Sequence, residues 1–213
     1  EKIFEYPWTP DFYFLALSIF GLCVSYLTAV YGWLLVMRRT GARMEWSRGF
    51  TIFTLSMMTR YIPGGIWLAL GRVYLCRLEG ISDSRSGIGI LLEQTYSLVG
   101  AGIVFAATFV FWKDTTPMIG ILPAIVFLPL VLFFLHPRLF LLIINPILVR
   151  LGKKAISIPF SFRQMILLSG YYSVYWVVSG IAFYFFVRAF YPIDVSNIPV
   201  FCGIYAISFI VGY

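Results

Sequence analysis

The segment RYIPGGIWLALGR, from Arg60 to Arg72, decides how this chain is expected to fold. It lies within a long apolar stretch, yet it has an arginine at each end and a Pro-Gly-Gly sequence at residues 63–65. Proline lacks the backbone donor that a helix needs, and it disfavours helical geometry at the preceding residue, here Ile62. The two glycines then permit a sharp turn. The segment therefore predicts two helices joined by a break, with a cation on each side of it.

The composition of the whole chain is typical of a membrane protein. Of its 213 residues, 61% are hydrophobic and 12% are charged, whereas soluble domains carry about 25% charged residues. About 20 helical residues cross a ~30 Å hydrocarbon core. Apolar runs of about that length lie at 12–37, 88–112, 117–135 and 165–190, and other apolar runs lie at 50–78, at 139–151 and from 198 onward. We expect an all-α, polytopic transmembrane helix bundle.

The basic residues predict which loops face the cytoplasm, because cytoplasmic loops of membrane proteins are enriched in Lys and Arg. If the stretches 50–78 and 139–151 each enter and leave on one side, 13 of the 16 Lys and Arg residues lie on that side. If both stretches crossed the bilayer, the basic loops would fall on both sides. The pattern favours a re-entrant helical hairpin at about 50–79, a second re-entrant or interfacial segment at about 139–151, and an N-terminus that faces outward.

The length of the two arms agrees with a hairpin. Residues 50–62 and 66–79 form arms that are each roughly 20 Å long at 1.5 Å per residue. Broken backbone at membrane depth has to be covered by protein or to line a wet cavity. The tip is therefore expected inside the bundle. The chain begins at Glu1 rather than Met and stops at Tyr213 within an apolar run, so we expect residues 1–213 to be one transmembrane domain of a longer protein.

The two arginines of the segment are candidates for binding an anion. A charged side chain at the bilayer centre costs ~2.5–3.5 kcal/mol on insertion scales, so it usually faces a cavity, a partner or a ligand. The amides of Gly64, Gly65 and Ile66 begin the second helix, and helix N-termini bind phosphate. Guanidinium groups beside such amides suit a phosphodiester head group. The alternative for Arg60 and Arg72 is snorkelling to the interface or an ion pair.

The next apolar run adds a carboxylate, in GILLEQTYSLVGAG at 89–102. Glu93 is expected at a depth similar to that of Arg72. Three roles for Glu93 stay open. It forms a structural ion pair with this arginine, or it holds the arginine until a lipid phosphate competes, or it contacts an amine on the head group. Tyr96 belongs to a polar collar at 94–97, which fits a helix that faces a cavity.

The sequence offers no catalytic or cofactor signature. It contains no nucleotide-binding or dinucleotide-binding glycine motif, no metal-ligand spacing and one histidine, His136. Its three cysteines, Cys23, Cys76 and Cys202, are scattered. No basic, aromatic-rich soluble patch suggests nucleic acid. We expect no enzymatic activity in this chain and no cofactor.

RYIPGGIWLALGRVYLCRLEGIS, followed closely by GILLEQTYSLVGAG, resembles the flippase-like transmembrane domain of lysylphosphatidylglycerol synthases and of related stand-alone proteins of bacteria and archaea. The matching positions are Arg60, Pro63, Gly64, Gly65, Trp67, Gly71, Arg72, Gly80 and Glu93. The resemblance implies that a lipid moves between leaflets, often an aminoacylated or glycosylated phospholipid or a polyprenyl carrier. The soluble aminoacyltransferase domain of the synthases is absent from these residues, so synthase activity is not expected of them.

We therefore expect a lipid translocase, of flippase or scramblase type, in the cytoplasmic membrane of a bacterium or archaeon. Its expected partners are membrane phospholipids and a second copy of itself, and no nucleic acid. The expected substrate-binding residues are Arg60, Pro63, Gly64, Gly65, Trp67, Arg72, Glu93 and Tyr96. Two alternatives stay open. One is a membrane platform or subunit of a lipid-modifying aminoacyl- or glycosyltransferase, and the other is a small-solute carrier.

Overall fold

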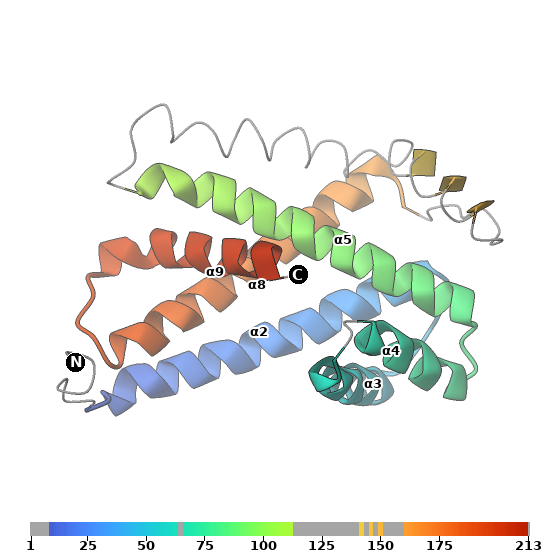
Figure 1. The fold of residues 1–213 in the computed structure, drawn as a ribbon, viewed down its shortest axis with the longest axis horizontal. Coiled ribbons are helices and arrows are strands. Elements are labelled where there is room, and N and C mark those ends of the chain that lie inside the picture. Colours follow the sequence, from blue (N-terminus) through green and yellow to red (C-terminus); the bar gives the residue numbers. More distant parts are fainter. Residues whose placement is uncertain are drawn as a thin grey trace. The chain divides into compact units, whose positions relative to one another are not determined.

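A computed structural model shows the chain as helical, as predicted (Figure 1). It describes residues 9–63, 66–112, 141–142, 145–146, 149–150 and 160–212. Every regular element in these ranges is an α-helix or a short 3₁₀ helix, the latter labelled η. In chain order they are α2 (Phe12–Arg39), α3 (Trp46–Met58), η1 (Thr59–Tyr61), α4 (Trp67–Leu78), α5 (Asp83–Thr108), η2 (Phe109–Phe111), α8 (Phe162–Arg188), η3 (Val195–Asn197) and α9 (Ile198–Gly212).

Four helical segments of the described chain are long and apolar enough to cross a membrane. They are Phe12–Arg39, Asp83–Phe111, Phe162–Arg188 and Val195–Gly212. The first three correspond to the predicted spans 12–37, 88–112 and 165–190, and the fourth comes from the apolar run that begins near Ile198. The predicted span 117–135 lies outside the described ranges, and so does the predicted re-entrant or interfacial segment at about 139–151, apart from a few isolated residues.

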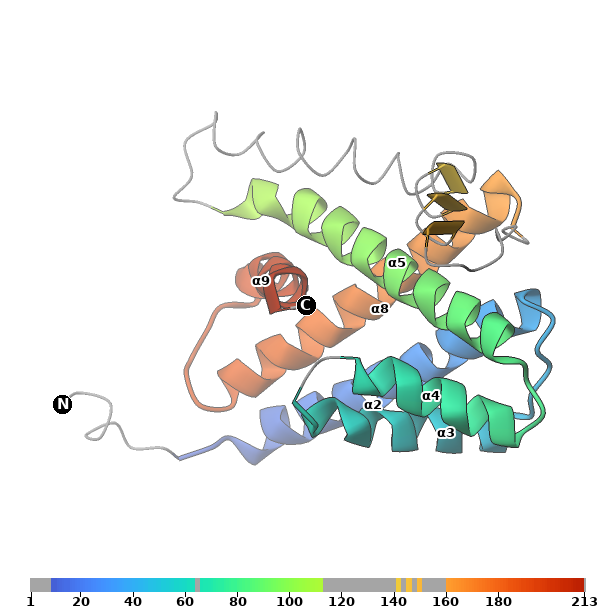
Figure 2. The same ribbon diagram turned by 45° about the vertical axis from the view of Figure 1, so that its right-hand side comes forward.

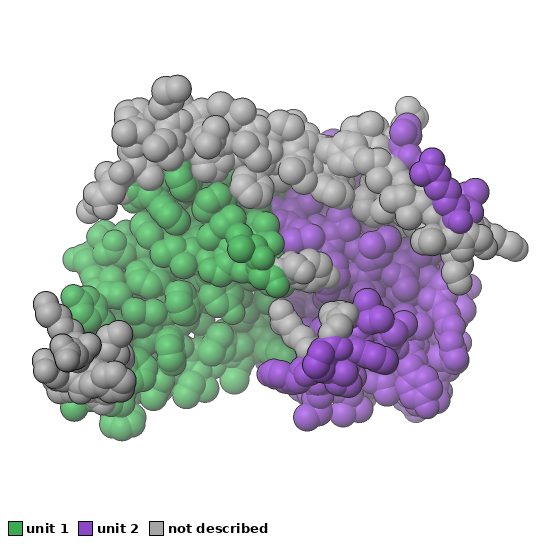
Figure 3. Space-filling model, in the orientation of Figure 1, with its two compact units in different colours: residues 1–26, 100–131, 173–213 green, residues 27–99, 132–172 purple. Residues whose placement is uncertain are grey.

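The chain groups into two compact units, which Figure 3 shows in different colours. Unit 1 comprises residues 1–26, 100–131 and 173–213, and unit 2 comprises residues 27–99 and 132–172. The long helices α2, α5 and α8 each contribute one part to unit 1 and the other part to unit 2.

Small residues let the helices of unit 1 approach closely. A Cβ atom added to Gly180 of α8 would lie 2.4 Å from the Cα atom of Cys202 in α9, closer than real atoms pack. The hydroxyl groups of Ser25 and Ser179 lie 2.5 Å apart in a buried hydrogen bond between α2 and α8. This pattern is usual where transmembrane helices pack. The core of the unit contains Ala101, Val104, Phe105, Phe109, Trp176, Cys202 and Ala206.

In unit 2, α3 and α4 form a helical hairpin, and Figures 1 and 2 both show them side by side. The helical run ends where Pro63 predicts, because Ile62 has extended backbone angles, φ −80° and ψ 125°. α3 begins at Trp46, four residues before the predicted arm at Phe50. The break in the helix is thus confirmed, while its re-entrant position in a bilayer stays a prediction.

Glycine caps end both α2 and α4. Gly41 has φ 86° and Gly80 has φ 76°, values that glycine adopts without steric cost. After α2, the amides of Gly41 and the next residue donate to the carbonyls of Arg38 and Met37, at 3.3 and 3.0 Å. The same pair of bonds closes α4, so both helices end in the Schellman motif. The chain can therefore reverse sharply after each helix.

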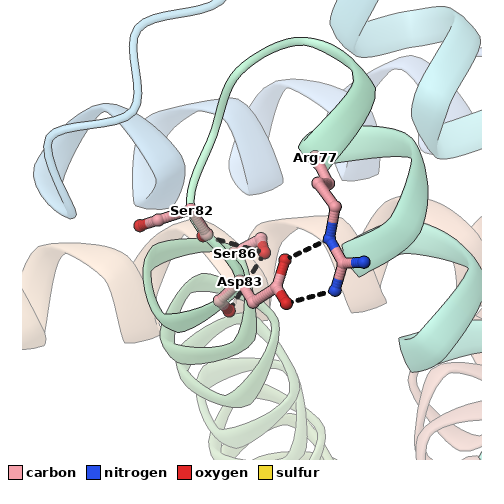
Figure 4. Close-up of polar contacts among 4 residues, drawn as sticks. All are labelled: Arg77, Ser82, Asp83 and Ser86. Atoms are coloured by element: carbon pink, nitrogen blue, oxygen red, sulfur yellow. Dashed lines mark hydrogen bonds and ion pairs between the residues drawn. The ribbon is translucent and has the colours of Figure 1, made fainter.

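Surface ion pairs join the helix ends at one end of unit 2. The guanidinium of Arg48, at the start of α3, pairs with Glu79, directly after α4. Arg77 in the last turn of α4 pairs with Asp83 in the first turn of α5, and its Nε lies 2.8 Å from Asp83 Oδ1 (Figure 4). The chain thus enters α3 and leaves α4 at the same end, as a re-entrant hairpin requires.

Candidate functional site

The guanidinium of Arg72 lies in the interior of unit 2 with 0% of the residue exposed. Its Nε donates to the hydroxyl of Ser56 at 3.0 Å, and its Nη1 donates to Glu93 Oε2 at 2.5 Å. The Ser56 hydroxyl donates in turn to the carbonyl of Phe53 at 2.8 Å. Arg72 is therefore neither snorkelling nor paired within its own helix, since its partners come from α3 and α5.

Two aromatic rings complete the surroundings of this guanidinium. Its central carbon lies 4.3 Å from the ring centroid of Phe53 and 5.2 Å from that of Trp33. Cation–π contacts of this kind are attractive, most strongly where water is excluded. Trp33 belongs to α2, so four helices of unit 2, α2 to α5, contribute to holding one cation.

Local sequence spacing explains how these side chains meet. Phe53 and Ser56 are three residues apart, so they share one face of α3. Arg72 and Cys76 are four residues apart and are the two buried residues of α4. The buried face of α4 thus carries a charged side chain, Arg72. The facing side of α3 is mainly apolar, and its Ser56 hydroxyl provides the hydrogen-bond acceptor that this charge needs. Glu93 lies on the inward face of α5 and is 5% exposed.

Hydrogen-bonding capacity is left over at this site. Arg72 Nη2 and Trp33 Nε1 are both buried donors without a hydrogen-bond partner among the described residues. Since the guanidinium lies 5.2 Å from the Trp33 ring, two unused donors belong to adjacent groups. Buried donors normally have a partner. The arrangement suits an acceptor such as a phosphate oxygen or a water molecule.

The predicted pair of Arg72 and Glu93 is confirmed, and Tyr96 lies near it in the sequence. Tyr96 is three residues after Glu93 on α5, 0% exposed, and packs edge-on against Phe160 with the ring centroids 6.3 Å apart. Its hydroxyl has no partner in the described part of the chain. The structure thus brings three of the predicted site residues into the interior of unit 2.

The predicted residues at the hairpin tip are arranged differently. Pro63 is exposed, and its carbonyl accepts a hydrogen bond of 2.8 Å from the indole of Trp67, which is 42% exposed. Trp67 therefore bonds back to the tip and not to Arg72. Arg60 belongs to η1, but its side chain lies outside the description, as do Gly64 and Gly65. The predicted amide site for phosphate is untested for this reason.

Three residues of the site were missed by sequence reasoning: Trp33, Phe53 and Ser56. Each lies in an apolar helix where a serine or an aromatic residue is ordinary packing material. The one usable signal was Ser56, a hydroxyl on the arm that faces Arg72 across the predicted break. The rings carried no signal, because contact between a ring and a cation depends on which helix faces which.

The described residues contain no group of three or more His, Cys, Asp or Glu side chains that could hold a metal ion. The polar chemistry of the site is thus a guanidinium, a carboxylate, hydroxyls and an indole. Of these groups, the guanidinium, the hydroxyls and the indole can donate hydrogen bonds to an anion.

Helices of this length and hydropathy define a multi-pass integral membrane protein. The family described as "Lysylphosphatidylglycerol synthase TM region" matches residues 7–213, and the chain belongs to this family. The match confirms the resemblance carried by the Pro-Gly-Gly segment. Comparisons with curated proteins and with solved structures found no match. The chain is an integral membrane protein of lipid metabolism or transport.

Proposed function

We propose that this chain translocates an anionic lipid between the leaflets of the cytoplasmic membrane of a bacterium or archaeon. The substrate is an aminoacylated or glycosylated phospholipid or a polyprenyl phosphate. The observation that carries the proposal is the buried guanidinium of Arg72, which has a donor without a partner among the described residues, beside a similar donor of Trp33. A charge of this kind inside a membrane domain of a lipid family is expensive and is usually functional.

The depth of the site supports a head-group site within the bilayer rather than at its surface. Ser56 is ten residues into α3, about 15 Å along the helix, and Arg72 is about 9 Å from the end of α4. Half of a ~30 Å hydrocarbon core is about 15 Å. If the ends joined by the surface ion pairs lie at the interface, the Arg72 site is well inside the apolar layer.

The conformation described here is closed around the cation. Since Arg72 is 0% exposed, a lipid phosphate reaches it only after α3, α4 and α5 separate. We propose that the phosphate then replaces Glu93, because a phosphate oxygen accepts the same charge-assisted hydrogen bond as a carboxylate. The sequence has no nucleotide-binding motif, so the transport is proposed to be passive or coupled to an ion.

Leaflet exchange in liposomes tests this proposal. The full-length protein is reconstituted with a fluorescent anionic phospholipid, and the fraction that an outside quencher can reach is followed over time. Arg72→Gln is expected to slow exchange by tenfold or more, while Arg48→Gln, which changes net charge equally, leaves it unaltered.

A second variant separates loss of function from loss of fold. In Arg72→Gln/Glu93→Gln both buried charges are removed together, which preserves stability better than removing one. We expect this double variant to fold and to exchange lipid as slowly as Arg72→Gln. A folded double variant that exchanges lipid at the parent rate would overturn the proposal.

The family description favours one further candidate, since it names the membrane region of a synthase. In that case the chain is the membrane platform of a lipid-modifying transferase, and the Arg72 site holds the lipid without moving it. A folded parent protein that retains anionic lipid and shows no leaflet exchange supports the platform over the translocase.

A further inference from the structure

A group of three arginines lines a pocket at the end of α2, apart from the Arg72 site. The pocket has a volume of about 710 Å³ and is lined by Leu35, Arg38, Arg39, Arg43, Met44 and Glu45. All six residues belong to unit 2. The lining includes three arginines and one glutamate, so it carries two positive charges in excess.

The arginines of this pocket differ from the others near the helix ends. Arg48 and Arg77 are each bound to a carboxylate, and hydrogen bonding to these partners raises the pKa of both arginines. Arg38, Arg39 and Arg43 make no ion pair within the described ranges. Their charge is therefore available to a ligand.

The backbone around the pocket weakens a source of repulsion for an anion. The last carbonyls of a helix form the negative end of its dipole. At the end of α2, the carbonyls of Met37 and Arg38 accept hydrogen bonds from the amides that follow the helix. Glu45 stands at the N-cap of α3 without a side-chain cap bond, so it does not neutralise the positive end of that helix by a direct bond.

We infer that this pocket binds a phosphate group, specifically the phosphodiester of an anionic membrane lipid. Arginine suits phosphate because its planar fork matches two phosphate oxygens. Arg38 and Arg39 end a candidate membrane span, where lipid head groups lie. Leu35 and Met44 supply apolar lining beside the cations for the glycerol and upper acyl carbons. This binding does not depend on translocation at Arg72.

The inference is tested against the simpler alternative that these arginines act only through net charge. The full-length protein is placed in neutral-lipid nanodiscs with a trace of spin-labelled phosphatidylglycerol, and the immobilised fraction of the label is measured. Arg38→Gln/Arg43→Gln is compared with Arg48→Gln/Arg77→Gln, which removes the same number of positive charges from the same unit. We expect the first pair to weaken retention by about 25-fold, since each of the two arginines near the surface contributes about fivefold, and the second pair to change it little.

Three further arms complete the test. Glu45→Gln is expected to increase retention, a gain that misfolding does not produce. Labelled phosphatidylcholine is expected to be retained equally by all variants. Binding of inorganic phosphate to the protein in neutral nanodiscs is followed by ³¹P line broadening. If inorganic phosphate binds and this binding is lost in Arg38→Gln/Arg43→Gln, the pocket is a phosphate site for a soluble ligand. Equal losses in the two double variants, or no loss in the pocket variant for either probe, would overturn the inference.

Discussion

Unit 2 contains the same ion-pair chemistry in two settings, its interior and its surface. In the interior, the side chains of Arg72 and Glu93 are 0% and 7% exposed. At the surface, Arg48 and Arg77, which pair with carboxylates at the helix ends, are 60% and 61% exposed. Each pair joins one arginine to one carboxylate on another element.

The difference shows that location, more than chemistry, decides what an ion pair does. Water screens an exposed pair, and the side chains lose entropy on pairing, so such pairs contribute little to stability. A buried pair has given up its hydration, so losing one partner leaves an uncompensated charge. The surface pairs therefore align helix ends, while the interior pair makes the packing of four helices depend on one guanidinium.

The largest expected effect is that of Glu93→Gln. It leaves Arg72 charged and buried without its carboxylate, which should destabilise the fold by about 3–5 kcal/mol. Thermal unfolding in detergent, followed by circular dichroism, measures the change. Glu79→Gln, which removes the carboxylate of an exposed pair, is the matched control. Equal unfolding midpoints for the two variants would show that the interior pair contributes no more to stability than the exposed pair.

Phe53→Leu should have the next largest effect. The ring lies 4.3 Å from the guanidinium carbon of Arg72, and a desolvated cation–π contact contributes about 2 kcal/mol. Leucine keeps an apolar side chain in α3 but removes the ring. The control is Phe50→Leu in the same helix, whose ring lies 6.5 Å from that of Trp46. The midpoint of thermal unfolding should fall more for Phe53→Leu than for Phe50→Leu.

Two glycines extend the comparison of interior and surface to packing. A Cβ atom on Gly49 would lie 2.4 Å from the buried Leu34 side chain, whereas one on Gly87 would meet nothing within 4 Å. Gly49→Ala should destabilise by about 1–3 kcal/mol through overpacking. Gly87→Ala should stabilise by up to about 1 kcal/mol, because alanine favours helix. Midpoints that move in the same direction would contradict the described contact between α2 and α3.

The smallest effect is expected for the exposed pair of Arg77 and Asp83. A double-mutant cycle with Arg77→Gln and Asp83→Asn should give a coupling energy within experimental error of zero, because both side chains are largely solvated. The cycle is repeated at high salt, where any residual coupling should vanish. Coupling as large as that between Arg72 and Glu93 would erase the distinction between the two settings.

Helix boundaries show how far hydropathy predicts this fold. The break at Ile62 was predicted because proline acts locally on the backbone. The start of α3 was placed at Phe50 instead of Trp46, because Ser47 and Arg48 are polar and hydropathy does not count them. The start of α5 at Asp83 was missed for a similar reason, although an acidic residue in the first turn favours a helix.

The candidate site was predicted in part. Arg72 and Glu93 were identified because charge is rare in apolar helices, and rarity is visible in a sequence. Ser56, Phe53 and Trp33 were not identified, because serine and aromatic residues are common there. Nor did the sequence show that Arg72 is enclosed, whereas the polar residues at 94–97 had been interpreted as facing a cavity.

The sequence by itself determined that this chain is a helical membrane protein with a helix broken at Pro63, since hydropathy and proline geometry act through neighbouring residues. It also identified the family, through the motif around the break. Only the tertiary structure decided which groups hold Arg72 and which arginines at the end of α2 form no ion pair with the residues that the structure describes. Those outcomes depend on contacts between helices distant in the chain, and no local rule specifies which faces meet.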